Sequence, residues 1–108
     1  MCGIAVHVDS LGRAGALDLE LIRHRGPDAC GEWRSGDGHY WLGNTRLAIV
    51  DLSPTGAQPM TDPATGNVIV TNGEIYNHRE VREKLGGNVA WRGTSDTETL
   101  LVGYARWG

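Results

Sequence analysis

The chain begins with Met1, Cys2 and Gly3, and an apolar run from Gly3 to Val8 follows at once. This run predicts a buried strand. A small residue after Met1 predicts that Met1 is removed, which would leave a thiol and a free α-amine on Cys2. The amine titrates at roughly 7.7 to 8.0 and a thiol near roughly 8.5, so the amine can act as a base beside its own nucleophile. The alternative is that Cys2 is only the first core residue of the strand, because Cys is among the most often buried residue types.

The composition predicts one domain and excludes several classes of partner. The 108 residues, 40% of them hydrophobic, are enough for one modest core, and 16 glycines indicate many tight turns or close backbone approaches. A net charge of -3 gives no reason to expect nucleic acid or an anionic membrane. No signal peptide or membrane-spanning run is visible, so we expect a cytoplasmic protein. Two cysteines and four scattered histidines predict neither a disulfide framework nor a metal site.

Hydrophobic periodicity and turn residues predict a mixed α and β fold. After the strand Gly3–Val8 we expect a short helix at 16–24, strands at 29–33, 39–42 and 45–50, and a long ordered loop at 51–64. An Asp-Gly turn at 35–38 would join the strands on either side of it. A strand at 67–71, a helix His78–Leu85 capped by Asn77, a weak strand at 89–91 and a last helix to about Arg106 complete the chain.

Two segments before residue 50 have both a structural and a functional interpretation. Arg25, Gly26, Pro27 and Asp28 are typical of a helix C-terminus, but they could also form a rigid loop that presents Arg25 and Asp28, as an ion pair for example. Arg46 interrupts an apolar segment. It is either buried, where its planar fork would suit a carboxylate, or on an edge strand in solvent.

Two segments in the second half also carry candidate site residues. Asn72-Gly73 is typical of a hairpin turn, yet a helix rather than a strand follows, which indicates a strand-to-helix junction where an amide side chain and a backbone N–H can face a ligand. Ser95 and Glu98 are in the N-cap and capping-box positions of the last helix. Asp96 has no such duty and could face a cationic group.

Six motifs together carry a resemblance to a known family. They are Met1-Cys2-Gly3-Ile4, Arg23 to Asp28, Arg46 to Asp51, Gly56-Ala57-Gln58-Pro59-Met60, Asn72 to His78, and Ser95-Asp96-Thr97-Glu98. Each is weak alone, but they occur in order and span nearly the whole chain. The chain resembles the glutaminase half of glutamine-dependent asparagine synthetases, a class II glutamine amidotransferase of the N-terminal-nucleophile hydrolase superfamily.

The resemblance implies a role for each matching residue. Cys2 would attack the side-chain amide of glutamine and form a glutamyl thioester with release of ammonia, with its own α-amine as general base. The Asn72 side chain and the Gly73 N–H would form the oxyanion hole, whose donors are typically worth about 2.7 to 4 kcal/mol each.

The remaining implied residues would bind the rest of the substrate. Arg46 would hold the α-carboxylate of glutamine, and Asp96, helped by Glu74, would hold its α-ammonium. The backbone of Ile49 and Val50 would line the same pocket. The candidate residues chosen from their chemistry alone agree with this assignment. Glutamine carries one carboxylate, one ammonium and one amide, and the sequence offers an Arg, an Asp and the Asn-Gly junction for them.

The resemblance also implies an α+β fold, the N-terminal part of a four-layer αββα sandwich with antiparallel sheets. Residues 1–108 would be a partial glutamine amidotransferase domain, and the ATP-dependent synthetase domain would be absent, so ATP and Mg are expected only there. A half sandwich would expose an apolar sheet face, which favours association, for example as a homodimer. L-glutamine, a synthetase domain or subunit, and aspartate as the ammonia acceptor are the implied partners. The alternative function is a non-catalytic glutamine-binding or interaction module.

Overall fold

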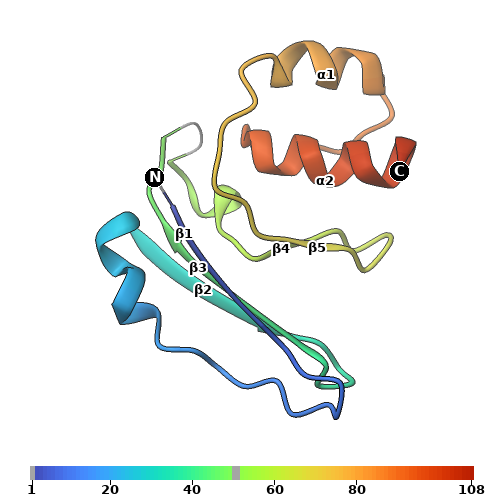
Figure 1. Cartoon of the computed structure of the whole chain (residues 1–108). Helices are drawn as coiled ribbons and strands as arrows, with labels where there is room; N and C mark the ends of the chain where they lie inside the picture. The colour runs from blue at the N-terminus through green and yellow to red at the C-terminus, as the bar shows by residue number, and fades with distance from the viewer. Residues whose placement is uncertain (1, 50–51) are drawn as a thin grey trace.

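A computed structural model describes residues 2–49 and 52–108 (Figure 1). Its strands are β1 (Gly3–Val8), β2 (Ala29–Arg34), β3 (Tyr40–Arg46), β4 (Met60–Thr61) and β5 (Val68–Ile69). Its helices are the 3-10 helices η1 (Leu19–Arg25) and η2 (Pro54–Gly56) and the α-helices α1 (His78–Leu85) and α2 (Asp96–Trp107). The expected combination of helices with antiparallel sheets, an α+β fold, is confirmed.

The three-stranded sheet has β3 at its centre, antiparallel to β1 on one side and to β2 on the other. We expected two separate strands at 39–42 and 45–50, and this was wrong, because β3 runs without a break from Tyr40 to Arg46. It ends there because Ala48 donates its N–H to the Asp28 carboxylate at 2.8 Å instead of to a neighbouring strand. The chain therefore leaves the sheet directly after Arg46.

The turn between β2 and β3 forms as its Asp-Gly pair predicts. The Gly38 N–H donates to the Ser35 carbonyl at 3.0 Å, and Gly38 adopts a φ of 76°, a conformation that favours glycine. The Asp37 carboxylate accepts from the Ser35 hydroxyl at 2.6 Å and from the His39 N–H at 3.0 Å. These contacts close the hairpin.

The helix expected at 16–24 is shorter and is a 3-10 helix, η1, which covers one face of the three-stranded sheet. The Asp18 side chain accepts from the Glu20 N–H and so caps the helix at residue 18, which is why it does not begin at residue 16. Gly26 ends the helix. It lies so close to the backbone of β3 that a side-chain carbon at this position would clash with the Thr45 carbonyl.

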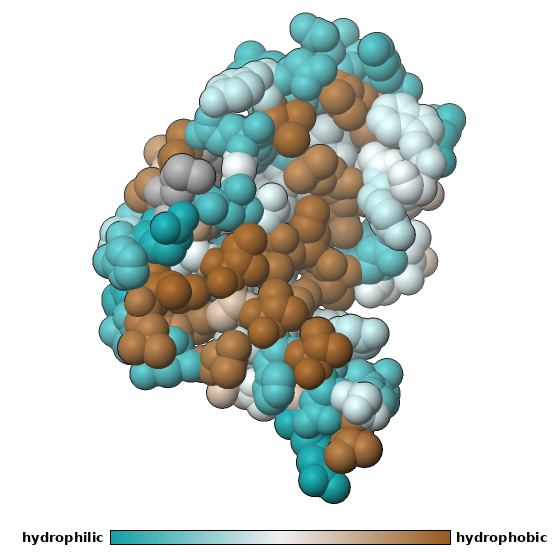
Figure 2. All heavy atoms as spheres, in the orientation of Figure 1, coloured by the Kyte–Doolittle hydropathy of each residue, from teal (hydrophilic) through white to brown (hydrophobic). Residues whose placement is uncertain are grey.

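The face of the sheet opposite η1 is exposed along β1. Ile4, Val6 and Val8 are 39%, 50% and 61% exposed, and they alternate with better-covered residues along β1. Figure 2 shows a broad hydrophobic area across the middle of this view of the molecule. The expected exposed apolar sheet face is therefore present in the part of the chain that the structure describes.

The second sheet and the α-helices lie on the other side of the molecule from η1 (Figure 1). The strand expected at 67–71 is reduced to β5, which pairs with β4 through Met60↔Ile69 and Thr61↔Val68. Helix α2 packs on both of these strands and on α1. The order of layers is therefore η1, the three-stranded sheet, the two-stranded sheet, and then the α-helices.

The boundaries of the two α-helices agree closely with those expected from the sequence, but some capping details differ. Helix α1 has the expected bounds, although the Asn77 side chain makes no capping hydrogen bond. The Ser95 side chain caps α2 by accepting from the Thr97 N–H. The Glu98 carboxylate does not complete a capping box, because it accepts from the backbone N–H groups of Arg92 and Gly93.

The strand expected at 89–91 was wrong. Trp91 instead stacks against the Arg82 guanidinium, whose Cζ lies 3.9 Å from the centroid of the ring. Of the helices in residues 2–49 and 52–108, none is long and apolar enough to span a bilayer; α2 has 12 residues.

Candidate active site

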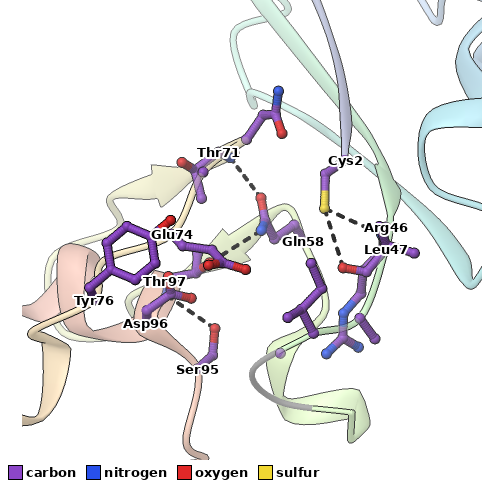
Figure 3. A pocket seen from close by; sticks show the side chains of 15 residues that line it. Cys2, Arg46, Leu47, Gln58, Thr71, Glu74, Tyr76, Ser95, Asp96 and Thr97 are labelled. Atoms are coloured by element: carbon purple, nitrogen blue, oxygen red, sulfur yellow. Dashed lines mark hydrogen bonds between the residues drawn. The ribbon is translucent and has the colours of Figure 1, made fainter.

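A cavity of about 410 Å³ lies where the end of β3, the segment at 71–76 and the start of α2 meet. Figure 3 shows Cys2 and Arg46 on one side of this cavity, with Glu74 and Asp96 on the other. The lining residues are Cys2, Arg46, Leu47, Ala48, Ile49, Gly56, Gln58, Thr71, Asn72, Gly73, Glu74, Tyr76, Ser95, Asp96 and Thr97.

Cys2 lies at the entrance to β1 with its thiol directed at the backbone of Leu47. The Leu47 N–H donates to Cys2 Sγ at 3.3 Å, and the thiol is 3.6 Å from the Leu47 carbonyl oxygen. The side chain is half-buried and lines the cavity, so it is not simply the first core residue of the strand. Arg25 Nε donates to the Cys2 carbonyl at 3.3 Å and helps to fix this end of the chain.

Arg46 is the last residue of β3 and is buried, with 8% of its surface exposed. The alternative of an edge-strand arginine in solvent is therefore wrong. Its Nη1 donates to the Ser53 carbonyl oxygen at 2.8 Å. A guanidinium carries five N–H donors, and a carboxylate in the cavity is a suitable acceptor for such a group.

The segment from Thr71 to Ile75 is fixed at both of its ends. The Thr71 N–H donates to Gln58 Oε1 at 2.7 Å, and the Ile75 N–H donates to Asp96 Oδ2 at 2.8 Å. Between them, Asn72 and Gly73 line the cavity, and no described contact within residues 2–49 and 52–108 uses the Asn72 amide or the Gly73 N–H. Two hydrogen-bond donors are thus presented on a segment whose ends are held.

Asp96 begins α2 and is 7% exposed. Its Oδ2 accepts from the backbone N–H of Ile75 at 2.8 Å, and its expected contact with a cationic group stays a prediction. Glu74 lies beside it on the same wall of the cavity (Figure 3). The cavity therefore has a guanidinium on one wall and two carboxyl groups on the other, an arrangement suited to a zwitterion.

The structure brings seven of the eight expected site residues to one cavity. They are Cys2, Arg46, Ile49, Asn72, Gly73, Glu74 and Asp96, and the eighth, Val50, lies outside the described residues. Their individual roles stay predictions. The proposed ion pair between Arg25 and Asp28 does not form, because Arg25 bonds the Cys2 carbonyl and Asp28 bonds the Ala48 N–H.

Sequence reasoning assigned no role to Gln58, Thr71, Tyr76 or Thr97, which also line the cavity. Gln58 is almost buried, 9% exposed, and bonds residues from three different segments. Its place in a short apolar motif between Gly56 and Met60 was a usable signal, because a polar side chain among buried neighbours needs partners. Within the described residues, no three His, Cys, Asp or Glu side chains form a cluster that could hold a metal ion.

Comparison with known proteins matches the whole chain to one family. The family described as "Glutamine amidotransferase domain" matches residues 1–108. Asparagine synthetase B of Escherichia coli is 40% identical over 97 residues, covering 89% of this chain and 17% of that protein. Asparagine synthetase 1 of Arabidopsis thaliana is 39% identical over 114 residues, covering 100% of this chain and 19% of that protein.

A relative with a different name matches to a similar extent. The amidase chry2 of Gibberella zeae is 36% identical over 123 residues, which cover 100% of this chain and 18% of that protein. The chain thus spans roughly a fifth of the length of the curated relatives that it matches.

Proposed function

Because this chain belongs to the glutamine amidotransferase domain family, we propose that its cavity binds L-glutamine and that Cys2 hydrolyses the side-chain amide to glutamate and ammonia. The observation that carries the proposal is the meeting of Cys2, Arg46, Asn72, Gly73 and Asp96 around one cavity. The thiol lies on the guanidinium side, and the carboxyl groups lie across from it (Figure 3).

The substrate is held at its amino-acid end by two opposite charges. The Arg46 guanidinium takes the α-carboxylate of glutamine, and Asp96 takes its α-ammonium with help from Glu74. Because Arg46 and Asp96 are both nearly buried, these contacts are stronger than they would be in water. A site built on buried polar groups also rejects analogues that lack one of the charged groups by large factors.

The reaction proceeds through a covalent thioester. Removal of Met1 gives Cys2 a free α-amine, which takes the thiol proton as Sγ attacks the δ-carbon of glutamine. The oxygen of the tetrahedral intermediate accepts from the Asn72 amide and the Gly73 N–H. The C–N bond then breaks, the α-amine returns the proton to the leaving ammonia, and water hydrolyses the thioester to glutamate and free thiol.

The rest of the protein's activity is a further part of this proposal. Ammonia passes to an ATP-dependent synthetase domain or subunit that amidates aspartate, and ATP and Mg bind there rather than in the cavity. The identity of 39% and 40% to asparagine synthetases supports aspartate as the acceptor. We also propose a cytoplasmic protein without nucleic-acid partners, and a homodimer that covers the exposed face of β1.

The test of the proposal is the intact mass of the protein before and after exposure to an electrophilic glutamine analogue. We expect loss of Met1 and one adduct, which excess glutamine prevents and Cys2→Ala abolishes. Cys30→Ala is the matched control, because Cys30 lies exposed on β2 and does not line the cavity. Retained Met1, or equal labelling of Cys2 and Cys30, would refute catalysis and favour the non-catalytic binding or interaction module.

A further inference from the structure

The side chain of Gln58 joins three segments that meet at the cavity. Its Oε1 accepts from the Thr71 N–H at 2.7 Å and from Asn44 Nδ2 at 3.4 Å, and its Nε2 donates to Thr97 Oγ1 at 3.2 Å. A backbone N–H can only donate, so the contact with Thr71 fixes which end of the amide is the oxygen. Asn44 Nδ2 also donates to the Gly3 carbonyl at 3.2 Å, which extends the connection to the residue after Cys2.

These contacts close a ring around the donors of the cavity. The ring runs from Gln58 to Thr71, along the chain to Ile75, across to Asp96, and through the next residue, Thr97, back to Gln58. Asn72 and Gly73 lie inside the part of the ring between its two anchors. Within residues 2–49 and 52–108, the Gln58 side chain links the segment that carries these donors to the residue after Asp96, by a path independent of the Ile75 contact.

The backbone of Gln58 lies close to the three-stranded sheet. A side-chain carbon at Gly31 on β2 would clash with the Gln58 carbonyl oxygen, so the absence of one there lets the Gln58 segment lie directly against the sheet. The segment that contains Gln58 therefore packs against the sheet that also contains β1 and β3.

We propose that Gln58 is a positioning residue that sets the spacing between the amide end and the α-ammonium end of bound glutamine. This inference rests on the proposed function. Glutamine presents its amide and its ammonium at opposite ends of one molecule, so the donors at Asn72 and Gly73 and the carboxylate of Asp96 must be held at a fixed separation. Glutamine at position 58 suits this task because it offers an acceptor to Thr71 and a donor to Thr97, and a misplacement of about 1 Å can cost roughly 100-fold in rate.

The test compares two buried threonines on the same helix turn. Thr97 accepts from Gln58 inside the ring, whereas Thr99 accepts from Arg82 outside it at 2.8 Å, and both are less than 5% exposed. Each Thr→Val variant loses its hydroxyl at nearly constant volume: Thr97 loses the contact with Gln58, and Thr99 loses the contact with Arg82 and a 3.4 Å contact with the Ser95 carbonyl. We expect Thr97→Val to raise the KM for glutamine by roughly 3- to 10-fold, the worth of one hydrogen bond, and Thr99→Val to leave it unchanged.

A second variant removes both ends of the Gln58 amide. Gln58→Met keeps the volume but removes both the acceptor and the donor, so kcat should fall in addition to the rise in KM, with kcat/KM lower by roughly 10- to 100-fold. Adding Thr97→Val to Gln58→Met should change the KM no further, because the contact is already lost. Amide hydrogen exchange at Thr71 should be at least about 10-fold faster in Gln58→Met than in wild type.

The outcomes separate the two proposals. A wild-type chain without glutamine turnover refutes the proposed function. Turnover by the wild type, with the KM equal in Thr97→Val and Thr99→Val, overturns the positioning role alone. Unchanged hydrogen exchange at Thr71 in Gln58→Met also overturns it, whether or not glutamine is hydrolysed.

Discussion

Arg82 on α1 holds the chain that leads into α2, and its replacement should be strongly destabilising. Its Nε donates to Thr99 Oγ1 at 2.8 Å, and its two terminal nitrogens donate to the carbonyls of Gly93 and Ser95 at 2.8 and 2.7 Å. The guanidinium also stacks on Trp91. All these partners belong to the last 18 residues, so one side chain from α1 organises the whole approach to α2.

The expected loss in the free energy of unfolding depends on the partners that Glu98 keeps when Arg82 is removed. The side chain of Glu98 is 4% exposed and lies 3.9 Å from Arg82. Without Arg82, its only remaining ion-pair partner among the described residues would be the more exposed Arg92. Removal of one partner of a buried pair typically costs about 3 to 5 kcal/mol, and we expect Arg82→Met to lower the free energy of unfolding by that amount. Arg82→Lys keeps the charge but not the planar fork, and should cost about 1.5 to 3 kcal/mol.

The measurement is urea unfolding of each variant, with the free energy extrapolated to water at an unchanged slope. Arg79→Met is the matched control, because Arg79 lies exposed on the same helix, and its loss should stay within about 0.5 kcal/mol of wild type. A domain of this size has roughly 5 to 15 kcal/mol in total, so the expected loss is easily resolved. Equal midpoints for Arg82→Met and Arg79→Met would refute the reasoning.

Three further predictions follow from the cavity and the hairpin. A side-chain carbon at Gly73 would meet no atom within 4 Å, so Gly73→Ala should leave the unfolding midpoint unchanged while lowering kcat for glutamine; a parallel loss of stability would contradict this. Arg46→Lys should raise the KM for glutamine by roughly 10-fold or more, since an ammonium cannot grip a carboxylate with two parallel hydrogen bonds, and an unchanged KM would argue against the proposed carboxylate contact. The hydrogen bond from the Ser35 hydroxyl, followed by that from the His39 N–H, holds the pKa of Asp37 below its ordinary value of 3.8. The contribution of Asp37 to stability is therefore complete above pH 3.8 and is lost as the pH falls through the lower pKa of the folded state. Acid unfolding of Asp37→Ala should lack this loss of stability.

Local signals in the sequence predicted the parts of the fold that depend on neighbouring residues. Ser95 caps α2, the turn at 35–38 closes a hairpin, and α1 has the expected bounds, because each depends on contacts within a few residues. The break expected between residues 42 and 45 does not occur. Gly43 and Asn44 are weak strand formers, but pairing with β1 and β2 on both sides overrides that preference.

Seven residues of the cavity were predicted from the sequence and the resemblance, whereas their geometry was not. The contact of Asp28 with Ala48 and the ring through Gln58 join residues 13 to 39 positions apart, and such hydrogen bonds leave no periodic pattern in a sequence. The 3-10 geometry of η1 was missed for a similar reason. Its apolar spacing is typical of an α-helix, and only the Asp18 cap and the fit of Gly26 against β3 set its actual bounds.

The separation of the cavity walls along the chain has a consequence for biosynthesis. Cys2 belongs to the first residues that a ribosome releases, while Asp96 and Thr97 follow some 94 residues later. At roughly 5 to 20 residues per second, about 5 to 20 seconds pass before the opposite wall has been synthesised. If Met1 is removed within that interval, the aminopeptidase acts before the opposite wall exists, and the nucleophile is matured before there is a pocket to enclose it.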